Sequence, residues 1–190
     1  MRTSALKTLE HDGARAIWET LAGVPWQQLV AQGRHQHQLR EELAERLAND
    51  PPRAIGEREI DAALGVAEFP HRTQIDKVGA PYLEHPKRVA ERVKDDDETY
   101  TVALLHDVLE DGLYHQAVGT EFVCSMSAIA RDFGPQIAVA VHRLTRSDSQ
   151  PDHLYYAQIR GNRLALAVKL ADIADNTNPT PHAPSRSLPT

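Results

Sequence analysis

An apolar stretch near the middle of the chain contains polar side chains that could do chemistry. The sequence VALLHDVLED, residues 102–111, places His106, Asp107, Glu110 and Asp111 among valine, alanine and leucine. Residues three and four apart are neighbours on a helix, so the imidazole and the carboxylates share about one turn. Burying such groups without partners is costly. The cluster therefore indicates a functional site rather than a solvated helix face.

Two further stretches combine an apolar pattern with isolated polar residues. In LALAVKLADIADN, residues 164–176, Lys169, Asp172 and Asn176 fall on one stripe of an otherwise apolar helix. In PYLEHPKRVA, residues 81–90, His85 lies on the first turn of an amphipathic helix, where it can face inward. An isolated histidine of this kind is more often a core residue than a ligand. Asp172, in contrast, needs a partner if it is buried.

A divalent metal ion would provide the partner that all three stretches need. Neutral imidazoles and carboxylates are good ligands, and a cation offsets buried negative charge. The proposed ligands are His85, His106, Asp107 and Asp172, with the spacing H-x20-HD-x64-D over three helices. A divalent ion activates water for attack on phosphorus, and Glu110 could orient that water or accept its proton. The alternative for Glu110 and its neighbour Asp111 is a solvated helix end.

Three other histidines show no paired spacing that would indicate a second metal ion: His115, His142 and His153. A mononuclear site is therefore favoured. Each of these histidines is expected to be a surface or core residue.

The elements that must position these residues are helices, because helical periodicity dominates and alternating β-branched runs are absent. This predicts an all-α bundle with short connections. Two N-terminal helices are predicted at 14–24 and 26–48, and their mixed charges fit a hairpin packed on the main domain or on a second subunit. Ser125 is a plausible N-cap. The later helices are predicted at 57–69, 81–93, 98–111, 125–133, 135–145, 153–159 and 163–176.

Composition excludes several classes of protein. With 190 residues, 41% hydrophobic and 25% charged, the chain can fold around one substantial core. Cys124 is the single cysteine and no signal-peptide pattern follows Met1, so a cytoplasmic location is expected. No stretch approaches the roughly 18 to 20 apolar residues that span a bilayer. The net charge of −6 argues against general nucleic-acid binding.

The motifs HRTQIDKVGAPYLEHPKRVA, ALLHDVLEDG and AVKLADIADN together resemble the HD-domain metal-dependent phosphohydrolases. The resemblance is to the RelA/SpoT branch, whose hydrolase domain degrades ppGpp and pppGpp. It implies that His85, His106, Asp107 and Asp172 hold one Mn²⁺ ion, and that Glu110 and Asp111 assist the attacking water. It also implies three parts: an N-terminal helical extension at 1–54, an HD phosphohydrolase domain at 55–179, and a poorly ordered tail at 180–190.

A phosphorylated substrate needs cations, which this acidic chain must supply locally. The predicted substrate contacts are Lys77, Arg146, Tyr156, Lys169 and Asn176. Another set of cations is expected to form an ordinary solvated helix face: Lys87, Arg88, Arg92 and Lys94.

The sequence departs from the alarmone hydrolases at two positions. Asp76 stands where one of a pair of basic residues is usual, and Ile173 stands where a basic residue often follows KLAD. These changes keep the metal ligands but put the guanosine preference in question. The leading hypothesis is a 3′-pyrophosphohydrolase of ppGpp. The alternatives are a phosphatase of another nucleotide, such as NADPH or a nucleoside triphosphate, and a non-catalytic nucleotide-binding HD module.

Overall fold

The structure is a computed structural model, and it describes residues 26–71, 81–110, 125–147 and 150–177. Every regular element in these ranges is a helix, which confirms the predicted all-α class. The helices are α3 (Trp26–Leu47), α4 (Glu57–His71), α5 (Glu84–Glu91), α6 (Asp97–Leu105), α8 (Met126–Phe133), α9 (Pro135–Leu144), α10 (Asp152–Arg160) and α11 (Arg163–Asn176). The predicted helix at 14–24 and the predicted tail at 180–190 lie outside the described residues.

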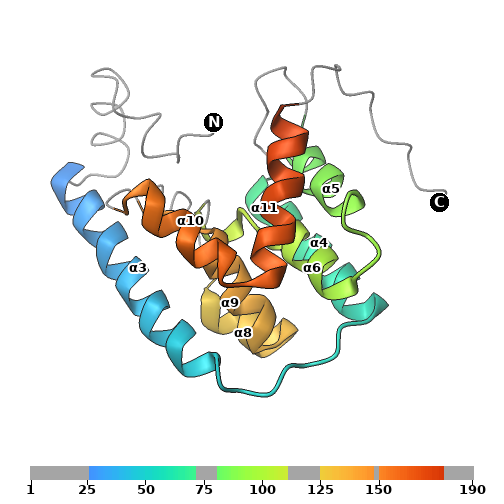
Figure 1. Cartoon of the computed structure of the whole chain (residues 1–190), viewed down its shortest axis with the longest axis horizontal. Coiled ribbons are helices and arrows are strands. Elements are labelled where there is room, and N and C mark those ends of the chain that lie inside the picture. Colours follow the sequence, from blue (N-terminus) through green and yellow to red (C-terminus); the bar gives the residue numbers. More distant parts are fainter. Residues whose placement is uncertain (1–25, 72–80, 111–124, 148–149, 178–190) are drawn as a thin grey trace.

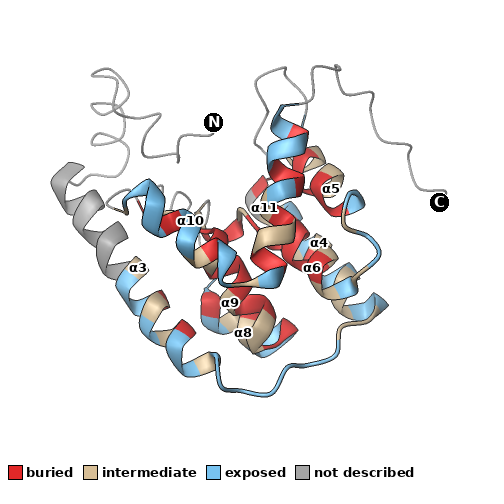
Figure 2. Ribbon diagram, in the orientation of Figure 1, coloured by how far each residue is buried: buried red, intermediate tan, exposed pale blue. Residues whose placement is uncertain are grey.

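Helix α6 lies at the centre of the bundle and packs against α4, α5, α9 and α11 (Figure 1). Its side chains from Thr101 to Leu105 are all buried, as expected for a helix that is apolar all round. Figure 2 shows the buried residues gathered where α6, α9 and α11 meet. The central position of α6 means that the polar residues at its C-terminal end lie inside the protein.

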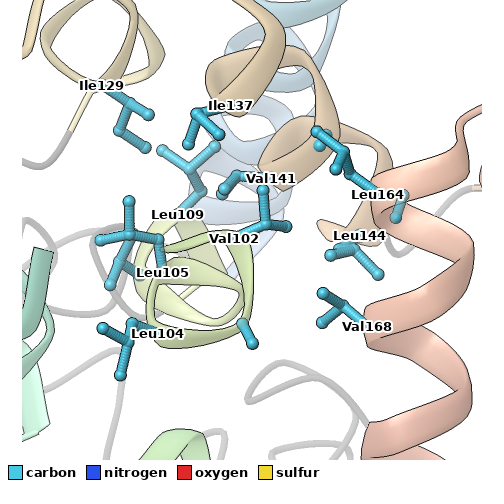
Figure 3. Packing of buried hydrophobic residues seen from close by; sticks show 14 of the residues in the cluster. Val102, Leu104, Leu105, Leu109, Ile129, Ile137, Val141, Leu144, Leu164 and Val168 are labelled. Atoms are coloured by element: carbon cyan, nitrogen blue, oxygen red, sulfur yellow. The ribbon is translucent and has the colours of Figure 1, made fainter. Parts of the chain in front are cut away.

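The apolar core fixes the position of the segment that follows α6. Figure 3 shows Leu105 and Leu109 facing Ile129 and Ile137 from α8 and α9, while Val168 approaches from α11. Leu105 and Val168 have no exposed surface, and Leu109 is only 1% exposed. Packing of this density restricts the backbone on both sides of His106 and Asp107.

Two helices begin just after a residue whose side chain caps the first helical turn. The Ser125 side chain accepts a hydrogen bond from Ala128 N at 3.1 Å, which confirms the predicted N-cap of α8. Asn162 caps α11 in the same way, through Ala165 N at 3.0 Å. Each cap satisfies a backbone donor that the first helical turn leaves unpaired. Helix α11 then runs over the predicted residues 163–176.

The predicted bounds of three helices were wrong. Helix α5 covers Glu84–Glu91 rather than 81–93, with turns before and after it. Helix α4 continues through Pro70 to His71, because a proline in the last turn removes one backbone donor without preventing the helical φ. The predicted helix over 98–111 is interrupted: α6 ends at Leu105, a turn holds His106 and Asp107, and helical geometry resumes at 108–110. At this break the Ala103 carbonyl accepts a hydrogen bond from the His106 ring, which competes with continuation of the helix.

Among the residues that the structure describes, no helix combines the length and the apolar character needed to cross a membrane.

Candidate metal centre

His85 lies at the second position of α5 and is held by a carboxylate on α11. The ring is 3% exposed, and its Nδ1 is 2.9 Å from Asp175 Oδ2. Because an ionised carboxylate can only accept, Nδ1 carries a proton, and Nε2 is the ring nitrogen that a neutral His85 would offer to a metal ion. A histidine fixed in this tautomer by a carboxylate is arranged as in known metal sites.

Asp175 is itself fixed by a cation from α5. Arg88 Nε donates to the two carboxylate oxygens at 3.1 and 3.2 Å, and its Nη2 donates to Oδ2 at 3.1 Å. Burial acts to raise the pKa of Asp175, but the hydrogen bonds from His85 and Arg88 hold that pKa well below its ordinary value. Asp175 therefore stays ionised as the partner of His85.

His106 lies in the turn after α6, with its ring 5% exposed. Its Nδ1 donates to the Ala103 carbonyl at 2.7 Å, which leaves Nε2 as the unprotonated nitrogen. Nε2 is buried and has no hydrogen-bond partner among the described residues. Burial lowers the pKa of His106, so the ring is neutral near pH 7. Nε2 lies 3.3 Å from Asp107 Oδ1. A buried, neutral imidazole nitrogen next to a carboxylate is a suitable metal ligand.

The predicted ligands converge from separate parts of the chain. His85, His106 and Asp107 each offer a ligand atom, and these atoms all lie within 4.8 Å of one another. Asp172 joins them from α11, with its Oδ1 3.3 Å from His85 Nε2. Asp107 also accepts a hydrogen bond from the Tyr82 hydroxyl. Two imidazoles and one carboxylate thus form a compact group, with the Asp172 carboxylate next to His85, and this donor set fits a divalent cation.

Two of the predicted substrate contacts hold Asp172 in this structure. Lys169 Nζ donates to its Oδ2 at 2.9 Å, and the Asn176 amide donates to its Oδ1 at 2.5 Å. Burial acts to lower the pKa of Lys169, but Tyr155 and Asp172 hold it above its ordinary value, so the ammonium is charged. A positive charge next to the predicted ligands suits a substrate with several phosphates.

Of the other predicted substrate contacts, Arg146 and Tyr156 lie within the described residues and Lys77 does not. The Arg146 guanidinium lies over the Tyr155 ring, 5.5 Å from its centroid, and also pairs with Asp152. Tyr156 is 48% exposed, whereas Tyr155 is buried, and the Lys169 ammonium lies 5.8 Å from the Tyr155 ring centroid. Lys77 and Asp111 fall outside the described residues.

Glu110, the predicted base, follows the ligands by one helical turn. Its Oε1 accepts a hydrogen bond from the backbone N–H of Arg146 at 2.6 Å, and its own N–H donates to the Asp107 carbonyl at 3.1 Å. The carboxylate is therefore fixed by backbone from a second segment. The remaining histidines are consistent with their predicted places where they are described: His142 is fully buried and His153 is exposed.

Sequence analysis did not predict the residues that hold the proposed ligands in place. Arg88 was expected on a solvated face, and this was wrong, because its side chain is 23% exposed and binds the buried Asp175. Asp175 and Tyr82 were not predicted at all. A signal was present for the pair: Asp175 is three residues after Asp172, and Arg88 is three residues after His85, so each shares a helix face with a predicted ligand.

Comparison with known proteins agrees with the fold. No family model matches the chain. A "GTP pyrophosphokinase" of Streptomyces coelicolor is 35% identical over 94 residues, which is 48% of this chain and 10% of that protein. A "Guanosine-3′,5′-bis(diphosphate) 3′-pyrophosphohydrolase" of Aquifex aeolicus is 41% identical over 76 residues, or 38% of this chain and 10% of that protein. The chain thus spans about a tenth of the length of these relatives.

A solved structure also matches the chain. Its description reads "A metazoan ortholog of SpoT hydrolyzes ppGpp and plays a role in starvation responses". The match has a TM-score of 0.51 and 26% sequence identity, and it covers 65% of this chain and 71% of that one. The chain is thus similar in sequence and in fold to proteins of the RelA/SpoT type, which confirms the resemblance found in the motifs.

Proposed function

We propose that this chain is a metal-dependent phosphohydrolase that removes the 3′ diphosphate of ppGpp. The observation that carries the proposal is the grouping of His85, His106 and Asp107, with Asp172 Oδ1 3.3 Å from His85 Nε2. The Aquifex aeolicus relative, whose name states this activity, and the similar SpoT ortholog support the choice of substrate. Mn²⁺ is the proposed ion.

In the proposed mechanism, the metal ion and the protein side chains have different roles. A divalent ion at this point would lower the pKa of a water molecule and offset charge on the phosphoryl oxygens. His85 and His106 contribute neutral nitrogens, each fixed by a bond from its other ring nitrogen. Asp107 and Asp172 contribute negative charge. The tautomers and orientations are thus set before any ligand arrives, which favours tight binding.

Glu110 is the proposed general base. Its Oε1 is fixed by the Arg146 N–H, one turn from His106. It accepts a proton from the water that attacks phosphorus, while the bond from phosphorus to the ribose 3′ oxygen breaks and that oxygen becomes protonated. The products are GDP and pyrophosphate. Asp111 is proposed to assist Glu110.

The phosphate groups of the substrate are negatively charged and need cations close to the metal centre. Arg146 and Lys169 lie 5.5 and 5.8 Å from the ring centroid of Tyr155, whose hydroxyl donates to the Leu144 carbonyl at 2.8 Å. Burial raises the pKa of Tyr155 to about 12, so the ring remains a neutral support for the two cations. We propose that these cations bind phosphate, together with Lys77, Tyr156 and Asn176.

The test is Glu110→Gln in a hydrolysis assay with Mn²⁺ and a binding assay on the same protein. Turnover of ppGpp should fall by roughly 100-fold to 10,000-fold, as for a lost general base, while metal and nucleotide affinity stay unchanged. The control is Glu57→Gln, an exposed glutamate at the start of α4. Equal activity of Glu110→Gln and wild type would remove Glu110 from the mechanism.

The substrate is tested on a panel with wild-type protein. Assays of ppGpp, NADPH and a nucleoside triphosphate distinguish the proposed activity from that of another nucleotide phosphatase. This comparison is needed because Asp76 and Ile173 stand where the resembling hydrolases usually have basic residues. Binding of nucleotide without turnover of any of them would instead indicate a binding module.

A further inference from the structure

The turn that follows α9 carries the backbone N–H that holds Glu110. Helix α9 ends at Leu144, and the Arg146 N–H donates to Glu110 Oε1 at 2.6 Å. This bond joins two segments that are 36 residues apart in the chain. A backbone donor fixes a side chain only as firmly as its own segment is held. The position of Glu110 therefore depends on what fixes this turn.

Part of the answer lies in α9 itself. The last four carbonyl groups of a helix have no partner within it and need other donors. The N–H of Thr145, which has no exposed surface, donates to the Val141 and His142 carbonyls at 3.1 Å each. These bonds leave the last two carbonyls of α9 to be satisfied from elsewhere.

Helix α10 supplies both of the missing donors. Gln158 Nε2 donates to the Arg143 carbonyl at 2.9 Å, and the Tyr155 hydroxyl donates to the Leu144 carbonyl at 2.8 Å. The hydroxyl thus binds the last residue of α9, where the turn begins. Removing it would leave a carbonyl without its donor beside the segment that holds the proposed base.

Tyr155 is itself held by the residues around it. It is 4% exposed, in contrast to its neighbour Tyr156 at 48%. Its ring centroid lies 5.5 Å from the Arg146 guanidinium and 5.8 Å from the Lys169 ammonium. Lys169 in turn donates to the proposed ligand Asp172 at 2.9 Å. Tyr155 therefore has a fixed orientation between the turn and the metal centre.

We infer that Tyr155 is a positioning residue for Glu110, with Gln158 in the same role on the adjacent carbonyl. The Tyr155 hydroxyl holds the Leu144 carbonyl, two residues before the Arg146 N–H, and so fixes the donor that orients the carboxylate. The inference rests on the proposed function, in which Glu110 is the base. Helix α10 then contributes to catalysis through the backbone that it holds, without a contact between these two side chains and the substrate.

Kinetics of Tyr155→Phe test this role, because the change removes the hydroxyl and keeps the ring beside the two cations. The loosened turn should misplace the base and lower kcat for ppGpp by roughly 10-fold to 100-fold, with KM and Mn²⁺ affinity changed by less than about threefold. The control is Tyr100→Phe, the same change at a half-buried tyrosine in the first half of α6, which should leave kcat unchanged. A kcat equal to that of the control, or a rise in KM at constant kcat, would overturn the inference.

Gln158→Ala is the second variant, and it removes the other bond from α10 to the end of α9. It should also lower kcat at nearly constant KM. If Tyr155→Phe fails to fold, this variant carries the test alone, and an unchanged kcat would overturn the inference.

A double-mutant cycle separates positioning from general damage to the fold. If Tyr155 acts through Glu110, adding Tyr155→Phe to Glu110→Gln should cause no further loss of kcat. Equal losses of kcat in the two backgrounds would overturn the inference.

Amide hydrogen exchange provides a readout without substrate. In Tyr155→Phe the Arg146 N–H should exchange roughly 3-fold to 10-fold faster, measured relative to the N–H of the buried Leu104 in α6. Exchange at Arg146 equal to that of wild type would overturn the inference. The expected change, found in a protein whose wild type does not hydrolyse ppGpp, would refute the proposed function and leave the contact between α10 and the turn standing.

Discussion

The strongest structural prediction concerns Asp175, which supports the metal centre without belonging to the proposed ligands. Asp175→Asn keeps the size of the side chain but removes the negative charge that His85 Nδ1 and Arg88 contact at 2.9 and 3.1 Å. The basicity of His85 Nε2 then falls, and Arg88 loses its buried counter-ion. Loss of such a supporting group typically weakens metal binding by about 10-fold to 100-fold. This corresponds to roughly 1.4 to 2.7 kcal/mol of binding free energy.

Calorimetric titration with Mn²⁺ measures the change in affinity. Thermal unfolding with and without Mn²⁺ provides a second readout, because weaker binding reduces the stabilisation that a given metal concentration confers. The control is Asp96→Asn, which removes a carboxylate that pairs with Arg163 at 3.2 Å outside the metal centre. Metal affinity in Asp175→Asn equal to that of wild type and control would refute the idea that this carboxylate supports His85.

Two further predictions concern stability. Burial lowers the pKa of His142 from 6.5 to about 4, even though Glu41 opposes the change, so the unfolded chain binds the proton more readily than the folded one. Folded-state stability should therefore fall as the pH drops from 6.5 towards 4, by roughly 3 kcal/mol in all, and His142→Gln should flatten this part of the pH profile of urea unfolding. A wild-type profile that is flat from pH 6.5 to 4 would contradict the assignment. Leu105→Ala should cost about 2 to 5 kcal/mol in urea unfolding, because Leu105 has no exposed surface; a loss under 1 kcal/mol would show that the site is not tightly packed.

Apolar patterning was sufficient to predict the helices that carry the proposed ligands. The apolar run before His106 and the stripe around Asp172 form α6 and α11, both buried against the same core. The ligands were visible because each is a polar residue inside an apolar pattern, where burial demands a partner. The spacing alone could not show that they meet, since this depends on how α5, α6 and α11 pack.

Other features depend on contacts that a single sequence does not reveal. Asp175 lies near the polar end of α11, and its partner His85 is 90 residues away in the chain. The break after Leu105 arises from a side-chain bond to Ala103, within a stretch whose periodicity favours one continuous helix.

The central claim is the proposal that this chain hydrolyses the 3′ diphosphate of ppGpp in a metal-dependent reaction. The most direct measurement is chromatographic analysis of products after incubation of purified protein with ppGpp and Mn²⁺, beside a chelator-treated sample and the Asp107→Ala variant. The account predicts GDP and pyrophosphate in equal amounts with wild type, and no product in the other two samples. Release of orthophosphate, or unchanged ppGpp with protein that binds Mn²⁺, would contradict it.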